Sequence, residues 1–289
     1  RNDFVETGSA RRMDGATGRL EAIECNPRLF ARTIDSKANV VWRGPEEPLR
    51  PDLSSVQGSS GALLFADFED GVRNGWYLTN GGQLSIVDDA AGIGSGNALS
   101  LAIDSQDYHQ RILSDFEAVN LVNVGDRISL RFDFRIASTA GFWKNGFRFG
   151  LFDSGMTRHG ADNAMDNTTL RAADDKGFFV MQSVGSENIV RIVRERGETD
   201  SFMGGDDLSY HATDESFGGI QNDLKHSVLF TVTRTSYGMK LEYWLDDSRY
   251  LSCTSSKELS RFDVVGFAAA DNLNCFMVDN IVVAFTPSP

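Results

Sequence analysis

The sequence predicts an all-β fold, an antiparallel β-sandwich with a β-rich N-terminal arm. Short runs of alternating apolar and polar residues recur from residue 62 onward, polar turns separate them, and no run has a convincing helical period. The 289 residues are enough for one large sandwich with an appendage. Two apolar runs, Leu63–Phe68 and Phe276–Phe285, begin and end the series, and we expect these first and last strands to come together.

Composition divides the chain into three parts. Residues 1–43 carry short strand signals around an Asp14-Gly15 turn and form the arm. Residues 44–61 hold three of the six prolines together with Ser and Gly, which predicts a linker. Residues 62–289 form the predicted sandwich.

Period-2 alternation predicts the strands of this sandwich and assigns their faces. Between the first and last strands the predicted strands are Trp76–Thr79, Leu84–Val87, Ala98–Ile103, His109–Leu113, Arg127–Ala137, Phe147–Phe152, Gly177–Val184, Ile189–Arg196, Ser227–Thr235, Met239–Leu245 and Asp263–Ala270. The pattern is clearest in Ile128–Ile136, where the apolar residues share one face. The residues expected to point outward are Arg131, Asp133, Arg135, Arg148, Gly150, Phe152, Lys240, Glu242 and Trp244.

Two long polar loops, 153–176 and 197–225, interrupt the strands. Loops of this length are uncommon in compact domains and indicate binding rims or disorder.

The charge and motif content exclude several classes of function. A net charge of −13 argues against nucleic acid or an anionic membrane surface as a partner. The sequence contains no G-x-S-x-G motif, phosphate-binding loop or dinucleotide fingerprint. Acidity is consistent with a soluble exported protein, and residues 1–20 lack a signal-peptide core, so we expect a mature form or a fragment. The expected location is extracellular, at the cell surface or periplasmic.

Three cysteines are too few for a disulfide scaffold. Cys253 and Cys275 lie near the ends of late strands, so they could form one bridge or remain two buried thiols. If they form a bridge, Cys25 would be left over.

The two ends of the predicted sandwich resemble a known family. The stretch Asp67–Trp76 (DFEDGVRNGW) and the final strand with Asp279-Asn280 resemble jelly-roll carbohydrate-binding modules of the concanavalin A-like or LamG type. The resemblance covers roughly residues 62–286 and implies a non-catalytic module that binds a glycan or a cell surface. The arm resembles the closing segment of FecR-like sensor domains, which implies a bacterial cell-envelope sensor. The residues that fit that pattern are Gly8, Ala10, Asp14, Gly18, Leu20, Ile23, Phe30 and Arg32.

The same resemblance implies a structural Ca²⁺ site. Its ligands would be Glu69 and Asp279, with backbone carbonyls from the loop 94–97. Ca²⁺ takes six to eight oxygen ligands, which carboxylates and carbonyls supply. Alternatively, Glu69 shapes a turn and Asp279 lies at a strand edge.

Sugar binding requires exposed aromatic rings and planar polar groups beside them. The candidate ligand-binding residues are Trp244, Glu242, Arg148, Arg131, Arg135 and Trp143. Gly150 beside Arg148 would leave room for a ligand above the sheet. The alternative is that the charged residues form cross-strand ion pairs and the tryptophans belong to the core.

Two further functions stay open. A polysaccharide lyase would use Tyr108 or His109 as the base and Arg148 to neutralise a substrate carboxylate. A structural envelope protein would instead assemble with copies of itself through the arm by strand addition. A glycoside hydrolase is disfavoured because no strand carries two carboxylates at the required spacing.

Overall fold

The computed structural model describes the chain from residue 61 onward, apart from 74, 80–81, 91, 94–95, 103–108, 137–141, 158, 163–174, 186–188, 198–201, 205–207, 216–218, 221–222, 257–258 and 271–274. The side chains at 109–110, 142–145 and 270 also lie outside the description, and of residues 1–60 only strand backbone is described.

The chain consists of two compact units, residues 1–51 and 52–289. In the first unit, three strands pair in the order β1-β2-β3 and two further strands pair with each other. These strands are β1 (Asp3–Glu6), β2 (Ser9–Met13), β3 (Leu20–Ile23), β4 (Arg32–Ile34) and β5 (Val40–Trp42). The boundary between the units falls inside the Pro-rich stretch 44–61.

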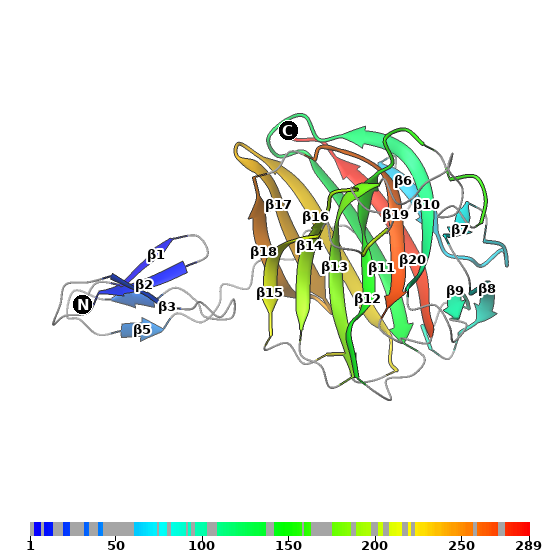
Figure 1. The fold of residues 1–289 in the computed structure, drawn as a ribbon, viewed down its shortest axis with the longest axis horizontal. Helices are drawn as coiled ribbons and strands as arrows, with labels where there is room; N and C mark the ends of the chain where they lie inside the picture. The colour runs from blue at the N-terminus through cyan, green and yellow to red at the C-terminus, as the bar shows by residue number, and fades with distance from the viewer. Residues whose placement is uncertain are drawn as a thin grey trace. The chain divides into compact units, whose positions relative to one another are not determined.

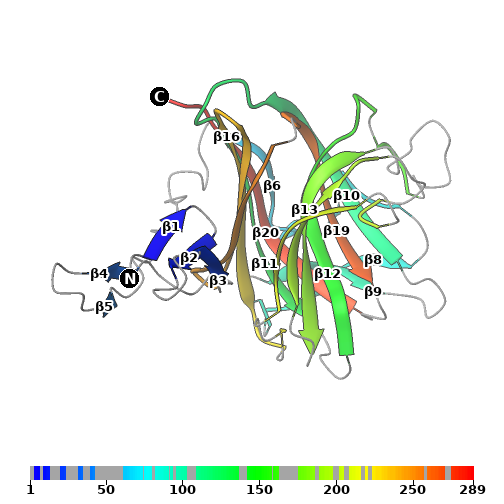
Figure 2. The same ribbon diagram turned by 60° about the vertical axis from the view of Figure 1, so that its left-hand side comes forward.

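The second unit is a sandwich of two antiparallel sheets, which lie face to face in Figures 1 and 2. The first sheet has seven strands in the order β15 (Ser209–Asp214), β14 (Val190–Glu195), β13 (Lys176–Gly185), β12 (Phe142–Asp153), β19 (Arg261–Ala270), β10 (His109–Asn120) and β7 (Trp76–Leu78).

The second sheet has eight strands. Seven follow the order β18 (Ser248–Ser255), β17 (Gly238–Leu245), β16 (His226–Thr235), β11 (Arg127–Ile136), β20 (Cys275–Thr286), β9 (Asn97–Ala102) and β8 (Gln83–Asp88). The eighth, β6 (Ala62–Ala66), pairs with β20, with Ala66 opposite Ile281. The described part of the chain contains no helix, so the predicted all-β sandwich and the pairing of its first and last strands are confirmed.

The core between the sheets is built by the predicted alternation. Ile128, Leu130, Phe132, Phe134 and Ile136 of β11 are all fully buried. Phe132 lies at the centre of an aromatic group, with ring centroids 5.0 Å from Phe149 and 4.8 Å from Phe267. Edge-to-face packing of this kind adds to the free energy gained by burying apolar area.

Part of the outer face of the seven-stranded sheet is also buried, which the sequence did not predict. Phe152 and Phe179 belong to a second apolar cluster that is covered by Phe202 and Met203 from the loop after β14. Gly266 of β19 makes room for this cover, because a Cβ there would lie 2.8 Å from both Phe202 Cζ and Met203 Cε.

Two strands of the sandwich were missed by the sequence analysis. Strands β15 (SYHATD) and β18 (SRYLSCTS) form the outermost strand of each sheet at the same side of the sandwich. An edge strand packs few apolar side chains, so its sequence carries little alternation.

Candidate functional site

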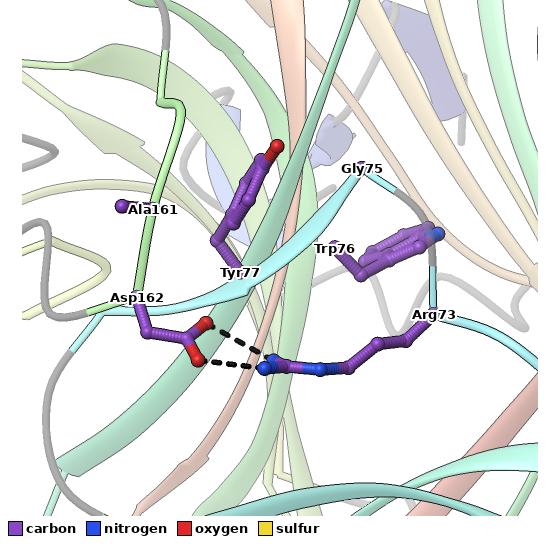
Figure 3. Close-up of a pocket in the computed structure, with 6 residues that line it drawn as sticks. All are labelled: Arg73, Gly75, Trp76, Tyr77, Ala161 and Asp162. Carbon is purple, nitrogen blue, oxygen red and sulfur yellow. Dashed lines mark hydrogen bonds and ion pairs between the residues drawn. The ribbon is translucent and has the colours of Figure 1, made fainter.

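A pocket opens beside β7, the edge strand of the seven-stranded sheet (Figure 3). Its volume is about 360 Å³. Two segments distant in sequence form it, the turn that leads into β7 and the loop after β12. The lining residues are Arg73, Gly75, Trp76, Tyr77, Ala161 and Asp162.

An ion pair between Arg73 and Asp162 joins the two segments. The guanidinium donates two hydrogen bonds to the carboxylate, from Nη1 to Oδ1 at 3.0 Å and from Nη2 to Oδ2 at 2.7 Å. Asp162 Oδ1 also accepts the backbone N–H of Leu78 at 2.9 Å. The bond from Arg73 holds the pKa of Asp162 below its ordinary value and raises that of Arg73. With side chains 38% and 36% exposed, the pair is available to a ligand.

The turn before β7 fixes the side chains on this wall. Trp76 N–H donates to the Arg73 carbonyl at 2.9 Å, and Gly75 adopts φ of +77°, which glycine tolerates without strain. Trp76 then packs into the core against Phe68. Because successive strand residues alternate, Tyr77 lies on the opposite face, where its ring is partly buried. Figure 3 shows its hydroxyl directed away from the ion pair.

The pocket combines an aromatic face with a planar donor and a planar acceptor. Arg and Asp in bidentate contact present hydrogen-bonding edges at fixed geometry while their charges compensate. Pockets that combine an aromatic surface with a few fixed polar groups are typical of small-molecule binding sites. The arrangement therefore suits a neutral, hydroxyl-rich ligand.

Trp244 was expected to be an exposed stacking platform, and this prediction is wrong because the side chain is 3% exposed. It packs against Leu229, its cross-strand neighbour on β16. The guanidinium of Arg249 lies 6.0 Å from its ring centroid.

Arg148 was expected to be an accessible ligand-binding residue, and this is also wrong. Its side chain does point to the outer face, but it is 6% exposed and donates to the Met203 carbonyl at 2.5 Å. The Phe202–Met203 cover explains the burial. Arg111 lies on the same face, and burial, followed by the charge of Arg148, lowers its pKa to about 10.

The other charged candidates lie on the outer face of the eight-stranded sheet. Glu242 forms ion pairs with Lys240 at 3.0 Å and Arg249 at 3.2 Å, and Arg135 pairs with Asp89 at 2.7 Å. Arg131 is partly exposed. Glu242 and Arg135 thus fit the alternative interpretation, a ladder of surface ion pairs.

Three candidates fall outside the description. Tyr108 and the side chains of His109 and Trp143 are not among the described parts, although His109 lies in β10 and Trp143 in β12. Their roles stay predictions.

The proposed calcium ligands lie in one acidic region. Asp279 is fully buried, and burial, aided by the charges of Glu69, Asp133 and Asp67, raises its pKa to about 7. The carboxylate of Glu69 lies against Gly96, so closely that a Cβ added at Gly96 would overlap it. Among the described residues, no group of three or more Asp, Glu, His or Cys side chains is placed to hold a metal ion.

Cys253 and Cys275 are both free thiols, so the alternative of a bridge between them is not adopted. Burial raises the pKa of Cys253 to about 12.

The sequence analysis missed Arg73, Tyr77 and Asp162 as site residues. Two signals pointed to their surroundings, the turn sequence before Trp76 and the length of the polar loop 153–176. Neither signal identifies Arg73 and Asp162 as partners.

No protein-family model matches the sequence, and no curated protein matches it. Among the described residues, none belongs to a helix that could cross a membrane.

Solved structures do resemble the chain. The Emp47p carbohydrate recognition domain is 14% identical, with 80% of this chain and 97% of that one covered and a TM-score of 0.52. A Bacillus subtilis protein with a galectin-like fold is 11% identical, with 79% of this chain and 98% of that one covered and a TM-score of 0.49. The carbohydrate-binding module CBM66 of Bacillus subtilis is 14% identical, with 73% of this chain and 95% of that one covered and a TM-score of 0.40. At these identities the likeness is one of fold: the chain carries an antiparallel β-sandwich similar to the Emp47p domain.

Proposed function

We propose that this sandwich is a non-catalytic module that binds neutral glycans in the Arg73–Tyr77–Asp162 pocket. The observation that carries the proposal is the exposed, bidentate Arg73–Asp162 pair beside the partly exposed ring of Tyr77. An aromatic face accepts a pyranose ring through its C–H surface, while the ion pair exchanges hydrogen bonds with hydroxyls.

Two further points support a neutral ligand. The charge of Arg73 is compensated by Asp162, so an acidic sugar would gain little at Arg73 and would meet the Asp162 carboxylate. The net charge of −13 also opposes the approach of polyanions. The similarity in fold to the Emp47p carbohydrate recognition domain agrees with glycan binding.

The lyase alternative gains no support from Arg148, which is covered by the loop after β14. An exported location, which rests on composition, and assembly through the arm, which rests on its strand signals, stay proposals. The FecR-like resemblance of residues 1–43 is not supported by any matching family model.

The test is affinity electrophoresis against neutral polysaccharides (laminarin, mannan, levan and xylan) and acidic ones (alginate and polygalacturonate). We expect retention by at least one neutral polymer and none by the acidic polymers. Tyr77→Ala should weaken that retention roughly tenfold or more. Tyr237→Ala is the matched control, since Tyr237 is 85% exposed on a hairpin between β16 and β17, in the other sheet. Retention unaffected by Tyr77→Ala would contradict the proposal, and new ultraviolet absorbance would indicate a lyase.

We also propose that Glu69 and Asp279 hold a structural Ca²⁺. The donors are hard oxygens. Burial, followed by the charges of the neighbouring carboxylates, raises the pKa of Asp279, and a bound cation would favour its charged form. Bound Ca²⁺ would neutralise these carboxylates and connect the chain before β7 to β20. Chelator should then lower the melting temperature of the wild type but not of Glu69→Gln, and equal behaviour of the two proteins would exclude this site.

A further inference from the structure

We propose that His159 is a positioning residue for the glycan pocket: it fastens the loop that carries Asp162 to β10. This inference rests on the proposed glycan-binding function. It concerns a buried histidine that does not touch the ligand and lies three positions before Asp162.

The contacts of His159 form a complete anchor. Its backbone N–H donates to Asp115 Oδ2 at 2.7 Å, and its ring Nδ1 lies 2.8 Å from Asp115 Oδ1. On the other side of the ring, Nε2 lies 3.6 Å from Asp175 Oδ2. The side chains of His159 and Asp175 are both fully buried, and that of Asp115 is 13% exposed. The imidazole is thus held between two carboxylates, away from water.

This anchor acts on the pocket through a short connection. Asp115 follows Ser114, which pairs in register with Trp76, so the strand that holds His159 also holds the pocket wall. Three residues span at most roughly 10 Å, so Asp162 cannot move far while His159 stays bound. The carboxylate of Asp162 then meets two fixed donors, Arg73 and the Leu78 N–H.

The shape of the ring distinguishes His159 from an ordinary buried contact. An imidazole carries two nitrogens on different edges of one rigid ring. Here Nδ1 faces Asp115 from β10 and Nε2 faces Asp175 from the segment before β13.

The first experiment measures the affinity of the wild type and of His159→Gln for the retained neutral polysaccharide. In His159→Gln the affinity should be roughly tenfold lower, because the loop that carries Asp162 loses its anchor on β10.

The control is His226→Gln, since His226 also contacts a carboxylate, Asp246 at 2.6 Å, but lies on β16 in the other sheet. This variant should keep the wild-type affinity. A His159→Gln protein with unchanged affinity would overturn the inference.

A second measurement needs no glycan. Amide hydrogen exchange at Leu78 reports on the hydrogen bond to Asp162, and we expect it to accelerate roughly tenfold or more in His159→Gln. If no polymer is retained but exchange accelerates, the glycan proposal fails while the positioning role stands. If polymer is retained and exchange is unchanged, the positioning role fails alone. Should His159→Gln not fold, Asp115→Asn tests the same anchor by the same exchange measurement.

Discussion

Arg73 and Asp162 lie 89 positions apart in the sequence and meet as a bidentate ion pair at 3.0 and 2.7 Å. The pair joins the turn before β7 to the loop after β12, and Asp162 also satisfies the Leu78 N–H next to it. Two separate parts of the chain thus depend on one carboxylate, and the site can be altered there without changing the core.

Arg73→Lys should weaken glycan retention roughly tenfold although the charge is kept. The reason is geometric, because an ammonium group cannot make two parallel hydrogen bonds to Asp162. Affinity electrophoresis on a neutral polymer measures the effect. Arg249→Lys, which alters the Glu242 pair on the other sheet, serves as the control and should bind normally. Equal loss in both variants would mean that the pocket is not the site.

Glycan binding should persist into moderately acid solution. Arg73 lowers the pKa of Asp162 below its ordinary value of 3.8, so the ion pair is fully formed above that value and is lost only as the pH falls through the lowered pKa. We expect no decline of affinity between pH 6 and about pH 4 and a loss below it. Asp162→Asn should bind weakly without this acid transition. A decline that begins well above pH 4 would point to another carboxyl group.

Phe132→Ala should lower the free energy of unfolding by about 3–5 kcal/mol, because the ring is fully buried among four other phenylalanine rings. Urea denaturation measures this. Phe65→Ala is the control, since Phe65 is 56% exposed and its loss should cost well under about 1 kcal/mol. A similar cost for both would contradict the described core.

Trp244→Ala should destabilise the protein by about 3–5 kcal/mol rather than abolish binding alone, since the indole is buried against Leu229. Trp244→Phe should cost less, because the indole nitrogen has no hydrogen-bond partner within the described residues. Urea denaturation and polymer retention are measured together. Selective loss of retention with full stability would restore Trp244 as a binding platform.

Gly238→Ala should destabilise the β16–β17 hairpin by more than about 1 kcal/mol. Gly238 adopts φ of +141°, and a Cβ there would overlap the carbonyl oxygen of Ser255 on β18. The control is Gly61→Ala, where the nearest atom to a Cβ is 3.4 Å away. Thermal melting distinguishes the two, and equal melting temperatures would show that β17 and β18 pack differently.

The alternation of side chains predicted the faces of the strands well. In Ile128–Ile136 the period of two is set by backbone geometry, so the buried set follows from the sequence directly. Strands β15 and β18 escaped because each contributes little to the core. The local pattern therefore predicts the central strands and misses two of the edge strands, β15 and β18.

Alternation says which way a side chain points, but not what covers it. Arg148 points outward as predicted and is still buried, because Phe202 and Met203 fold back over it from more than 50 positions away. The Arg73–Asp162 pair likewise forms between two segments that are distant in the sequence. Contacts between distant loops depend on tertiary structure, and a single sequence carries no local signal for them.

The pairing of β6 with β20 has a consequence for biosynthesis. Ala66 and Ile281 are neighbours in one sheet, and β20 lies between β11 and β9, so the eight-stranded sheet cannot form until β20 has been translated. Contacts of such high sequence separation make folding slow, and the unpaired edges are prone to aggregation in the meantime. The nascent chain therefore exposes unpaired strand edges until β20 has emerged from the ribosome.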